Sequence, residues 1–540
     1  MRLNNAGLGD REAWAAAGYT LPSFDRSEMM RRTAETPKWV HFGAGNIFRA
    51  FQANVCQKLL DRGETDTGII VAEGFDYEII ERMYRPHDDL SVLVTLKADG
   101  STEKTIVGSM AESCILDTHR EAEFGRLKEI FSNPSLQMAS FTITEKGYSL
   151  SGANGDVFPA VAEDFENGPD RPESYIGKVA ALLYARYRAG QYPIAMVSMD
   201  NCSHNGEKLF RAIHAYGVEW VENGRVEKGF LGYIEDPGKI SFPWSMIDKI
   251  TPRPDASVQA VLAADGLQDT EPVVTSRNTY TAPFVNAEES EYLVIEDRFP
   301  NGRPPLEKAG IIFTDRDTVN RVERMKVCTC LNPLHTALAV FGCLLGFQKI
   351  SDEMKDPALR ELIRRIGYQE GLPVVTDPGV LDPKKFIDTV VDIRIPNPYI
   401  PDTPQRIATD TSQKLAIRFG ETIKAYLASD TLDIRELKLI PLVFAGWLRY
   451  LMGVDDDGRV FGLSPDPLLD EARPVVAAFH VGDSVSAEDA EKQLLPLLKN
   501  AGIFGVNLEK IGMAGPVSEY FTGMLAGRGA VRAVLEKCVR

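Results

Sequence analysis

The feature that most constrains the fold is a strand, a glycine turn and a helix that follow one another early in the chain. The segment WVHFGAG (39–45) is an apolar run that ends in two glycines. Residues 46–63 then carry apolar side chains at helical spacing, and GIIVAEGF (68–75) is a second apolar run with an acidic end. A strand–helix–strand unit of this length favours a parallel sheet with a right-handed crossover.

The same alternation continues to about residue 297, after which the pattern becomes mainly helical. Strands are predicted at 136–144, 192–200 and 291–297, and helices at 175–190 and 206–224. Further helices are predicted at 317–326, 333–346, 354–367, 383–394, 412–428, 436–453 and 486–502.

This order predicts an α/β protein with a Rossmann-like doubly wound sheet domain, followed by a mainly α-helical C-terminal domain. We expect an N-terminal extension over residues 1–37 and a dinucleotide-binding domain over 38–305. A helical substrate-binding and catalytic domain is expected over 306–540.

Composition excludes several classes of protein. A net charge of −17 disfavours nucleic-acid binding, which needs a basic surface. The 7 cysteines are scattered, which suits a reducing compartment. Cys328 and Cys330 lack a second Cys or His pair, so no metal site is expected. The apolar runs 331–347 and 439–454 are too short to span a membrane, so we expect a soluble, cytoplasmic monomer or small homo-oligomer.

The glycine turn has the features of a dinucleotide-binding loop. Two glycines let the backbone approach a pyrophosphate, and the start of the next helix offers free N–H groups and a positive dipole end. Phe48 stands where a third glycine is usual, so a plain tight turn is the alternative. We predict cofactor contacts from Gly43, Ala44, Gly45, Asn46, Ile47 and Arg49.

Two carboxylates, Glu73 and Asp76, follow the second predicted strand. An acidic side chain at this place accepts hydrogen bonds from ribose hydroxyls and repels a 2′-phosphate. The pattern therefore favours NAD over NADP as cofactor. The alternative is that both carboxylates lie in a solvated loop.

Asp200 and Asn201 follow the predicted strand 192–200. Functional groups of α/β enzymes gather at such carboxyl ends of strands. An Asn amide there donates a hydrogen bond to a developing oxyanion. The alternative is that Asn201 caps the next helix.

The segment ERMKVCTCLNPLH (323–335) brings three kinds of polar group together. Asn332 before a proline predicts a helix start, so Lys326 ends the preceding helix and His335 lies in the first turn of the next. A buried lysine suits a general base because desolvation favours its neutral amine. A buried histidine is more often a core residue than a catalytic one.

Seven segments together carry a resemblance to a known family. The chain resembles the polyol-specific long-chain dehydrogenases, the mannitol dehydrogenase family, over most of its length and in the family's order. The matching segments are GAGNIFR (43–49), TITEKGY (142–148), SMDNCSHNG (198–206), FPWSMIDKITP (242–252), ERMKVCTCLNPLH (323–335), RIPNPYIPDTPQRIATDTSQK (394–414) and AGWLRYLMGVDDDGR (445–459).

The resemblance implies a role for each matching residue. Lys326 corresponds to the general base, and Asn201 and Asn332 to the pair that holds the reacting oxygen. His335 corresponds to a residue that orients the substrate, and Glu323 to a carboxylate that relays protons to solvent. The positions that match the family's substrate pocket are Asp248, Thr329, Arg406 and Lys414. One departure stands out, since five residues separate Lys326 from Asn332 where the family pattern has four.

The resemblance implies an NAD-dependent oxidoreductase that needs no metal and acts on a small sugar acid or polyol. The reaction we expect is D-mannonate + NAD⁺ = D-fructuronate + NADH. Arg406 and Lys414 are candidates for the substrate carboxylate. The alternatives are a mannitol/fructose or tagaturonate/altronate dehydrogenase on the same scaffold. A catalytically silent nucleotide sensor is the alternative from another class.

Overall fold

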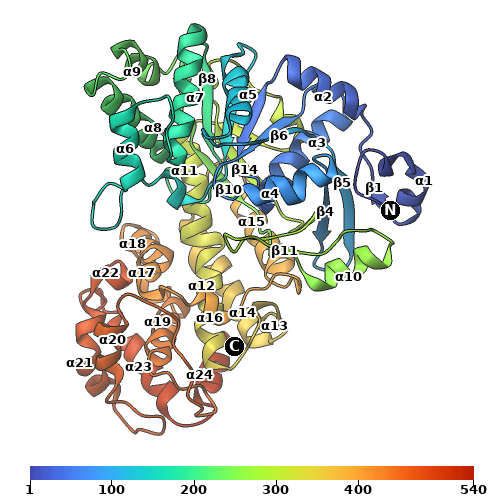
Figure 1. The fold of residues 1–540 in the computed structure, drawn as a ribbon. Coiled ribbons are helices and arrows are strands. Elements are labelled where there is room, and N and C mark those ends of the chain that lie inside the picture. The colour runs from blue at the N-terminus through green and yellow to red at the C-terminus, as the bar shows by residue number, and fades with distance from the viewer. The chain divides into compact units, whose positions relative to one another are not determined.

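The computed structural model describes residues 1–540, which form two compact units. The first comprises Met1–Lys97 and Ser101–Val319, and the second comprises Ala98–Gly100 and Asn320–Arg540. In Figure 1 the first unit runs from blue to yellow-green and holds the sheets, whereas the yellow-to-red second unit is helical.

A six-stranded parallel sheet forms the centre of the first unit. The predicted doubly wound fold is confirmed, because the strand order reverses between β2 and its neighbour β7, which is the arrangement of a dinucleotide-binding sheet. The strands, in spatial order, are β6 (Met110–Ile115), β3 (Ile69–Glu73), β2 (Trp39–Phe42), β7 (Met138–Phe141), β8 (Ile194–Ser198) and β9 (Ile240–Ser241).

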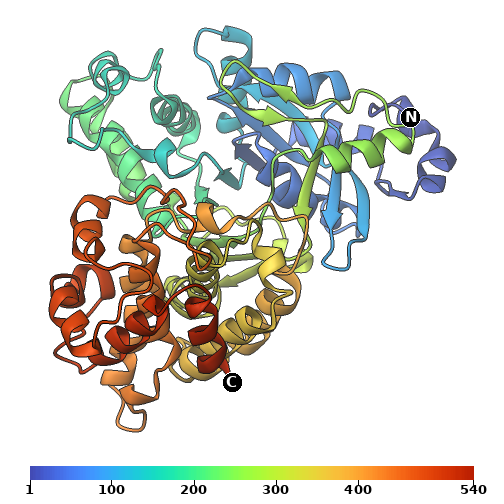
Figure 2. The same ribbon diagram turned by 90° about the horizontal axis from the view of Figure 1, so that it is seen from below.

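Alternating side chains of these strands form two hydrophobic cores. Val40 and Ile70 point to a face covered by α5 (Glu121–Ser132) and α7 (Tyr175–Gly190), whereas Trp39 points to the face covered by α3 (Ala53–Asp61). Figures 1 and 2 show the helices on both sides of the sheet. Because both faces are buried, the strands read as continuous apolar runs.

The first unit also contains strands that the sequence patterns do not predict. A mixed sheet has the order β1 (Tyr19–Thr20), β5 (Thr102–Val107), β4 (Ser91–Leu96) and β13 (Phe284–Glu288). A smaller sheet joins β14 (Tyr292–Glu296), which confirms the strand predicted at 291–297, to β10 (Ser245–Asp248) and β15 (Ile312–Thr314). Residues 1–37 contribute β1 and α2 (Arg26–Glu35) to this unit.

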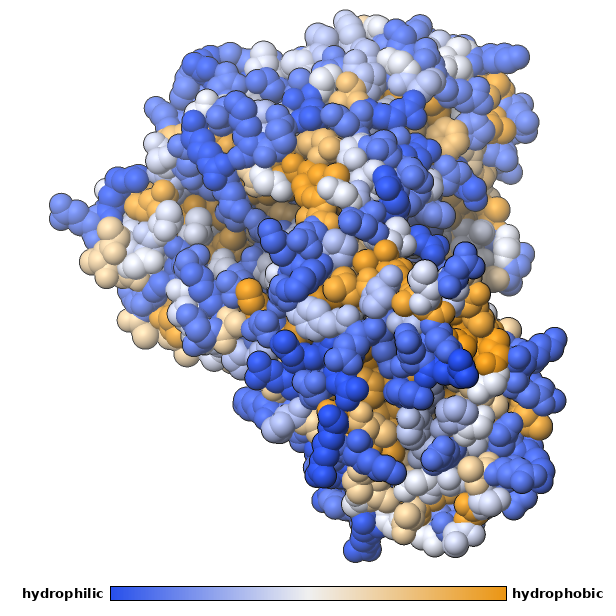
Figure 3. Space-filling model, turned by 180° about the vertical axis from the view of Figure 1, so that it is seen from behind, coloured by the Kyte–Doolittle hydropathy of each residue, from blue (hydrophilic) through white to orange (hydrophobic).

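The second unit is built around two buried helices, α12 (Asn332–Leu344) and α19 (Leu439–Tyr450). Both coincide with the apolar runs of the sequence. The continuous helical stretch Arg316–Leu344 is long and apolar enough to cross a membrane, but 78% of its most apolar window is buried inside the protein, as expected of a core helix. The face shown in Figure 3 is mostly hydrophilic.

A carboxylate connects the C-terminal helix to the far end of α12. The backbone N–H of Asp456 donates to the carbonyl oxygen of Leu344 at 2.8 Å. The Asp456 carboxylate accepts from the backbone N–H groups of Val531 and Arg532, at 2.8 and 3.0 Å, in the first turn of α24 (Ala530–Val539). The turn VDDDGR (454–459) therefore links α12 to α24 through the hydrogen bonds of Asp456.

Arg186 of α7 holds the amino-terminal edge of the parallel sheet together. Its side chain is fully buried and donates to five backbone carbonyl oxygens at 2.7–2.9 Å. The acceptors lie at the end of α5 and immediately before β7 and β8, in Phe131, Asn133, Leu136, Tyr192 and Pro193. A single guanidinium thus satisfies loops that enter two neighbouring strands.

Arg186→Met should lower the free energy of unfolding by about 3 kcal/mol or more, because each buried carbonyl left without a partner costs about 1–3 kcal/mol. Chemical denaturation measures this loss. Arg188→Met is the matched control, since Arg188 lies on the same helix but is exposed and pairs only with Glu227. Equal losses in the two variants would contradict the role of Arg186.

Glu353 of α13 (Ile350–Glu353) is a buried acid without a hydrogen-bond partner for either carboxylate oxygen. It packs against Gly342, where an added Cβ would lie 2.0 Å from Glu353 Oε1. Burial raises the pKa of Glu353 well above its ordinary value. The folded state therefore favours the protonated carboxyl group.

The stability that protonated Glu353 contributes is present at low pH and is lost as the pH rises above the ordinary pKa of a glutamic acid. Glu353→Gln should therefore gain stability relative to the wild type between pH 5 and pH 8. Denaturant unfolding at both pH values measures the difference. Glu488→Gln, at an exposed glutamate, is the control. A Glu353→Gln difference that is independent of pH would refute this assignment.

Candidate active site

The glycine turn follows β2 at the point where the strand order reverses. Gly43 has φ +107°, and a Cβ there would lie 2.3 Å from the carbonyl oxygen of Thr142 in the neighbouring loop. At Gly45 an added Cβ would meet nothing within 4 Å. The first glycine is therefore required by the fold, whereas the second leaves open space above the turn.

The carboxylate of Glu73 holds the glycine turn in place. The side chain is buried at the end of β3, and its carboxylate accepts from the backbone N–H groups of Ala44, Phe75 and Asp76 at 2.7–3.1 Å. Burial raises the pKa of Glu73, and the three hydrogen bonds act in the opposite direction. Asp76 accepts from the hydroxyl of Thr275 at 2.6 Å. A ribose contact by either carboxylate stays a prediction.

Arg49 is buried beside the turn, and its terminal nitrogens already have protein acceptors. They donate to the carbonyl oxygen of Ala282 at 2.6 Å and to Asn46 Oδ1 at 2.8 Å. Burial lowers the pKa of Arg49, which has no carboxylate partner. Arg49 thus fixes Asn46 at the start of the helix, and a phosphate contact stays a prediction.

Phe75 is a residue of this region that the sequence patterns missed. Its side chain follows Glu73 and is 61% exposed, with the Arg277 guanidinium 5.3 Å from the ring centre. An exposed aromatic ring next to the turn offers a surface on which a base can stack. The signal in the sequence is an apolar residue two positions after the acidic end of a strand.

Asp200, at the end of β8, organises the loop that carries Asn201. Its carboxylate accepts from the backbone N–H groups of Ile143 and Thr144 at 3.0 and 2.9 Å, and from the Tyr148 hydroxyl. Thr144 has φ +64°, so this contact supports a strained backbone. Burial raises the pKa of Asp200.

Asn201 itself is exposed in the loop between β8 and α8 (Asn205–Glu222). The N-cap of α8 is His204, so the alternative that Asn201 caps this helix is wrong. Asp248 is buried at the end of β10 in the same unit.

In the second unit a π-helical turn joins the two helices that carry the remaining candidates. α11 (Arg316–Met325) runs into a π-turn over Lys326–Cys330, and α12 begins at Asn332. The backbone N–H of Leu331 donates to the carbonyl oxygen of Lys326 at 3.1 Å, an i→i+5 bond that accommodates one extra residue within a helix. Glu323 lies one turn before Lys326 on α11.

The structure thus places Lys326, Asn332 and His335 along one nearly continuous helical segment. Lys326 is buried, and Asn332 and His335 are partly buried. No side-chain atom of Asn332 or His335 is hydrogen-bonded to the protein. Burial lowers the pKa of His335 to about 4, opposed by Asp402 and reinforced by Arg394, Arg418 and Arg406. The imidazole is therefore neutral near pH 7.

The predicted pocket residues of this unit differ in their surroundings. Thr329 is buried in the π-turn, with its methyl group close to Gly371. The Arg406 side chain is 62% exposed and forms an ion pair with Asp402. Lys414 Nζ donates to the carbonyl oxygen of Thr409, and burial lowers the pKa of Lys414.

Arg418 also faces this cluster and was missed by sequence reasoning. It lies in the π-helical segment Ala416–Gly420 and donates from Nη1 to Thr336 Oγ1 at 2.6 Å. Thr336 directly follows His335 on α12. The available signal was spacing, because Arg418 stands four residues after Lys414, on the same side of a helix.

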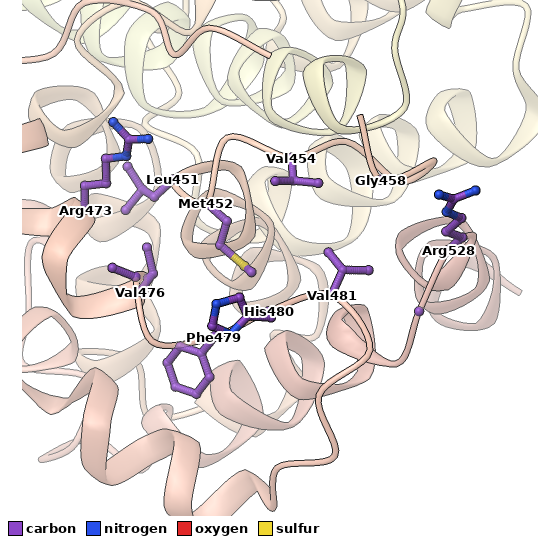
Figure 4. A pocket seen from close by; sticks show the side chains of 12 residues that line it. Leu451, Met452, Val454, Gly458, Arg473, Val476, Phe479, His480, Val481 and Arg528 are labelled. Carbon is purple, nitrogen blue, oxygen red and sulfur yellow. The ribbon is translucent and has the colours of Figure 1, made fainter. Parts of the chain in front are cut away.

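The cavity shown in Figure 4 lies elsewhere in the second unit. It has a volume of about 640 Å³ and none of the predicted site residues in its lining. Arg473, His480 and Arg528 stand there among apolar side chains such as Met452 and Phe479. It offers no lysine amine or asparagine amide for the expected chemistry.

A dinucleotide fits the residues of the glycine turn. The helical segment that begins at Asn46 has N–H groups without intrahelical partners, and the space above Gly45 is open. The switch point of a doubly wound sheet is also where such cofactors bind.

Two family models match the chain. The mannitol dehydrogenase Rossmann domain matches residues 37–308, and the mannitol dehydrogenase C-terminal domain matches residues 318–511. The chain therefore belongs to the mannitol dehydrogenase family. It is an NAD-dependent oxidoreductase that acts on a CH–OH group.

The chain is similar to several known proteins over almost its whole length. It is 54% identical to D-mannonate oxidoreductase of Thermotoga maritima, covering 100% of this chain and 99% of the relative. It is 30% identical to D-mannonate oxidoreductase of Escherichia coli, covering 95% and 97%. Mannitol 2-dehydrogenase of Pseudomonas fluorescens, solved with NAD and D-mannitol, superimposes with a TM-score of 0.68 at 26% identity, covering 99% of each chain.

Substitution of the two glycines should separate folding from cofactor binding. Gly45→Ala points a methyl group into the open space, so we expect an unchanged melting temperature and a fall in NADH affinity of about tenfold, or 1.4 kcal/mol. Gly43→Ala meets the Thr142 carbonyl at positive φ and should destabilise the fold by about 1–3 kcal/mol. Fluorescence titration with NADH and thermal unfolding measure the two effects. Unchanged NADH affinity in Gly45→Ala would contradict the cofactor site.

Proposed function

We propose that the protein interconverts D-mannonate and D-fructuronate with NAD as the cofactor. The observation that carries the proposal is the 54% identity to D-mannonate oxidoreductase of Thermotoga maritima along the whole of both chains. Three arginines around His335 support it, because a sugar acid brings a negative charge that a neutral polyol lacks.

Lys326 acts as the general base in the oxidative direction. Its buried amine takes the proton of the reacting hydroxyl group, and in reduction the ammonium returns it. Glu323, one helical turn earlier, passes that proton to solvent. When bound, NAD supplies the nicotinamide that accepts or donates hydride.

Asn332 and His335 hold the reacting end of the substrate. The unpartnered amide of Asn332 donates to the oxygen on which negative charge develops. The family resemblance implies the same role for the amide of Asn201. The neutral His335 ring has both nitrogens free for substrate hydroxyl groups. No step in this scheme requires a metal ion, because amides and an ammonium carry the charge.

As the family resemblance implies, the substrate site in this proposal is lined by Asp248, Thr329, Arg406 and Lys414. We place the enzyme in the cytoplasm, which is supported by its 7 free cysteines. We propose a boundary between the cofactor domain and the catalytic domain near residue 305, whereas the first compact unit of the structure extends to Val319.

Lys326→Ala should reduce turnover by about 10²–10⁴-fold, the usual contribution of a general base. The measurement is NADH oxidation with fructuronate, tagaturonate and fructose, each tested separately. Lys424→Ala is the matched control, because Lys424 is a half-exposed lysine of the same unit that pairs with Glu421. NADH affinity should be unchanged in both variants.

Each result of the substrate panel has a distinct meaning. Turnover of fructuronate that is lost only in Lys326→Ala supports the proposed reaction and its base. Turnover of tagaturonate or fructose alone would move the assignment to another dehydrogenase of the same family. An enzyme that binds NADH but turns over none of the three would overturn the proposed reaction.

A further inference from the structure

We propose that Arg418, held in place by Thr336, binds the carboxylate of a sugar acid and thereby selects acids over neutral polyols. The inference deepens the proposed function and rests on it for the choice of substrate. It concerns a residue outside the set that the family resemblance implies.

Arg418 is a cation without an anionic partner. No carboxylate lies within ion-pair distance of its guanidinium, and its one side-chain hydrogen bond goes to the neutral hydroxyl of Thr336. Burial alone lowers the pKa of Arg418 to about 10. A desolvated charge is normally paired, so a site that keeps one unpaired is prepared for an anion from outside.

The Thr336 hydroxyl fixes where the guanidinium lies. It accepts from Arg418 Nη1 at 2.6 Å and donates to the carbonyl oxygen of Asn332 at 3.0 Å. The hydroxyl therefore uses its single proton on α12 and presents a lone pair to the arginine. This chain of bonds attaches the charge to the helical turn that carries Asn332 and His335.

Arg406 and Lys414, the two cations that the family resemblance implies, are less suited to this task. Arg406 is already neutralised by Asp402, and its side chain is mostly exposed. Lys414 has given a hydrogen bond to the Thr409 carbonyl and offers only a point charge. Arg418 keeps four of its five N–H donors unused by the protein, in the planar arrangement that binds a carboxylate through two parallel hydrogen bonds.

Arg418 differs in its surroundings from Arg186, an arginine that stabilises the fold. Arg186 is fully buried and donates to five carbonyl oxygens, so its charge is compensated within the fold. Arg418 is only partly buried, and ligands can therefore reach it. Removing the Arg418 charge should not lower the free energy of unfolding, whereas removing a structural arginine such as Arg186 should.

The experiment compares Arg418→Met with wild type on two ligands that differ in one terminal group, D-mannonate and the neutral D-mannitol. Calorimetry with the NADH-loaded and the cofactor-free protein gives the affinities, and kinetics with fructuronate and fructose gives kcat/KM. Arg435→Met, at an exposed arginine paired with Asp433, is the control. Thr336→Val tests the positioning contact.

We expect Arg418→Met to weaken D-mannonate binding and to lower kcat/KM for fructuronate by about 100-fold, as the loss of a bidentate charged contact implies. D-Mannitol binding should change less than about threefold, and the melting temperature should stay equal or rise. Thr336→Val should lower kcat/KM for fructuronate by about tenfold, mainly through KM.

The two hypotheses fail in different ways. If wild type reduces fructuronate and Arg418→Met does so equally well, the proposed function stands and the role of Arg418 is overturned. If wild type turns over no uronate, the proposed reaction fails. The affinity for D-mannonate then decides whether Arg418 forms a carboxylate site. A selective loss of D-mannonate affinity in Arg418→Met supports the carboxylate site, and equal affinities overturn it. An equal loss for D-mannonate and D-mannitol would show a merely structural role.

Discussion

Between Lys326 and Leu331 the backbone makes an i→i+5 hydrogen bond, and the direction of every candidate side chain on α12 depends on it. Each residue added to an α-helix turns the following side chains by about 100°. The π-turn accommodates one extra residue while the helix continues. The Lys326 amine, the Asn332 amide and the His335 imidazole therefore keep fixed directions relative to one another. The five-residue spacing seen in the sequence is thus compatible with a lysine and an asparagine that work together.

Two kinds of buried charged or polar group occur in this protein. In the first, Arg186 and Glu73 are compensated by backbone carbonyl or N–H groups, and the loops around the sheet are fixed as a result. In the second, Arg418 and the free groups of His335 and Asn332 lack internal partners. Arg186 and Glu73 are thus paired within the fold that they stabilise, whereas Arg418 lacks an internal anion and is the proposed ligand contact.

The elements with strong periodicity were predictable from the sequence, but the partners of individual side chains were not. Helix α7 has the predicted bounds 175–190, and β2 and β3 fall within the predicted strands, because both faces of the sheet are buried. The sheet of β4, β5 and β13 was missed because β13 joins it from a distant part of the chain. Arg418 was missed because its spacing from Lys414 indicates only a shared side of a helix, whereas its significance lies in the absence of a carboxylate partner.

The turn at Asp456 connects the last helix of the chain to α12. One residue binds the final carbonyl of α12 through its backbone and the first N–H groups of α24 through its carboxylate. The family model ends at residue 511, so α24 lies outside the part that the family model covers. Asp456 thus connects α24 to the carboxyl end of the helix on which Asn332 and His335 lie. A substitution that displaces the start of α24 would therefore reach α12 through a single residue, at the end of the helix opposite to Asn332.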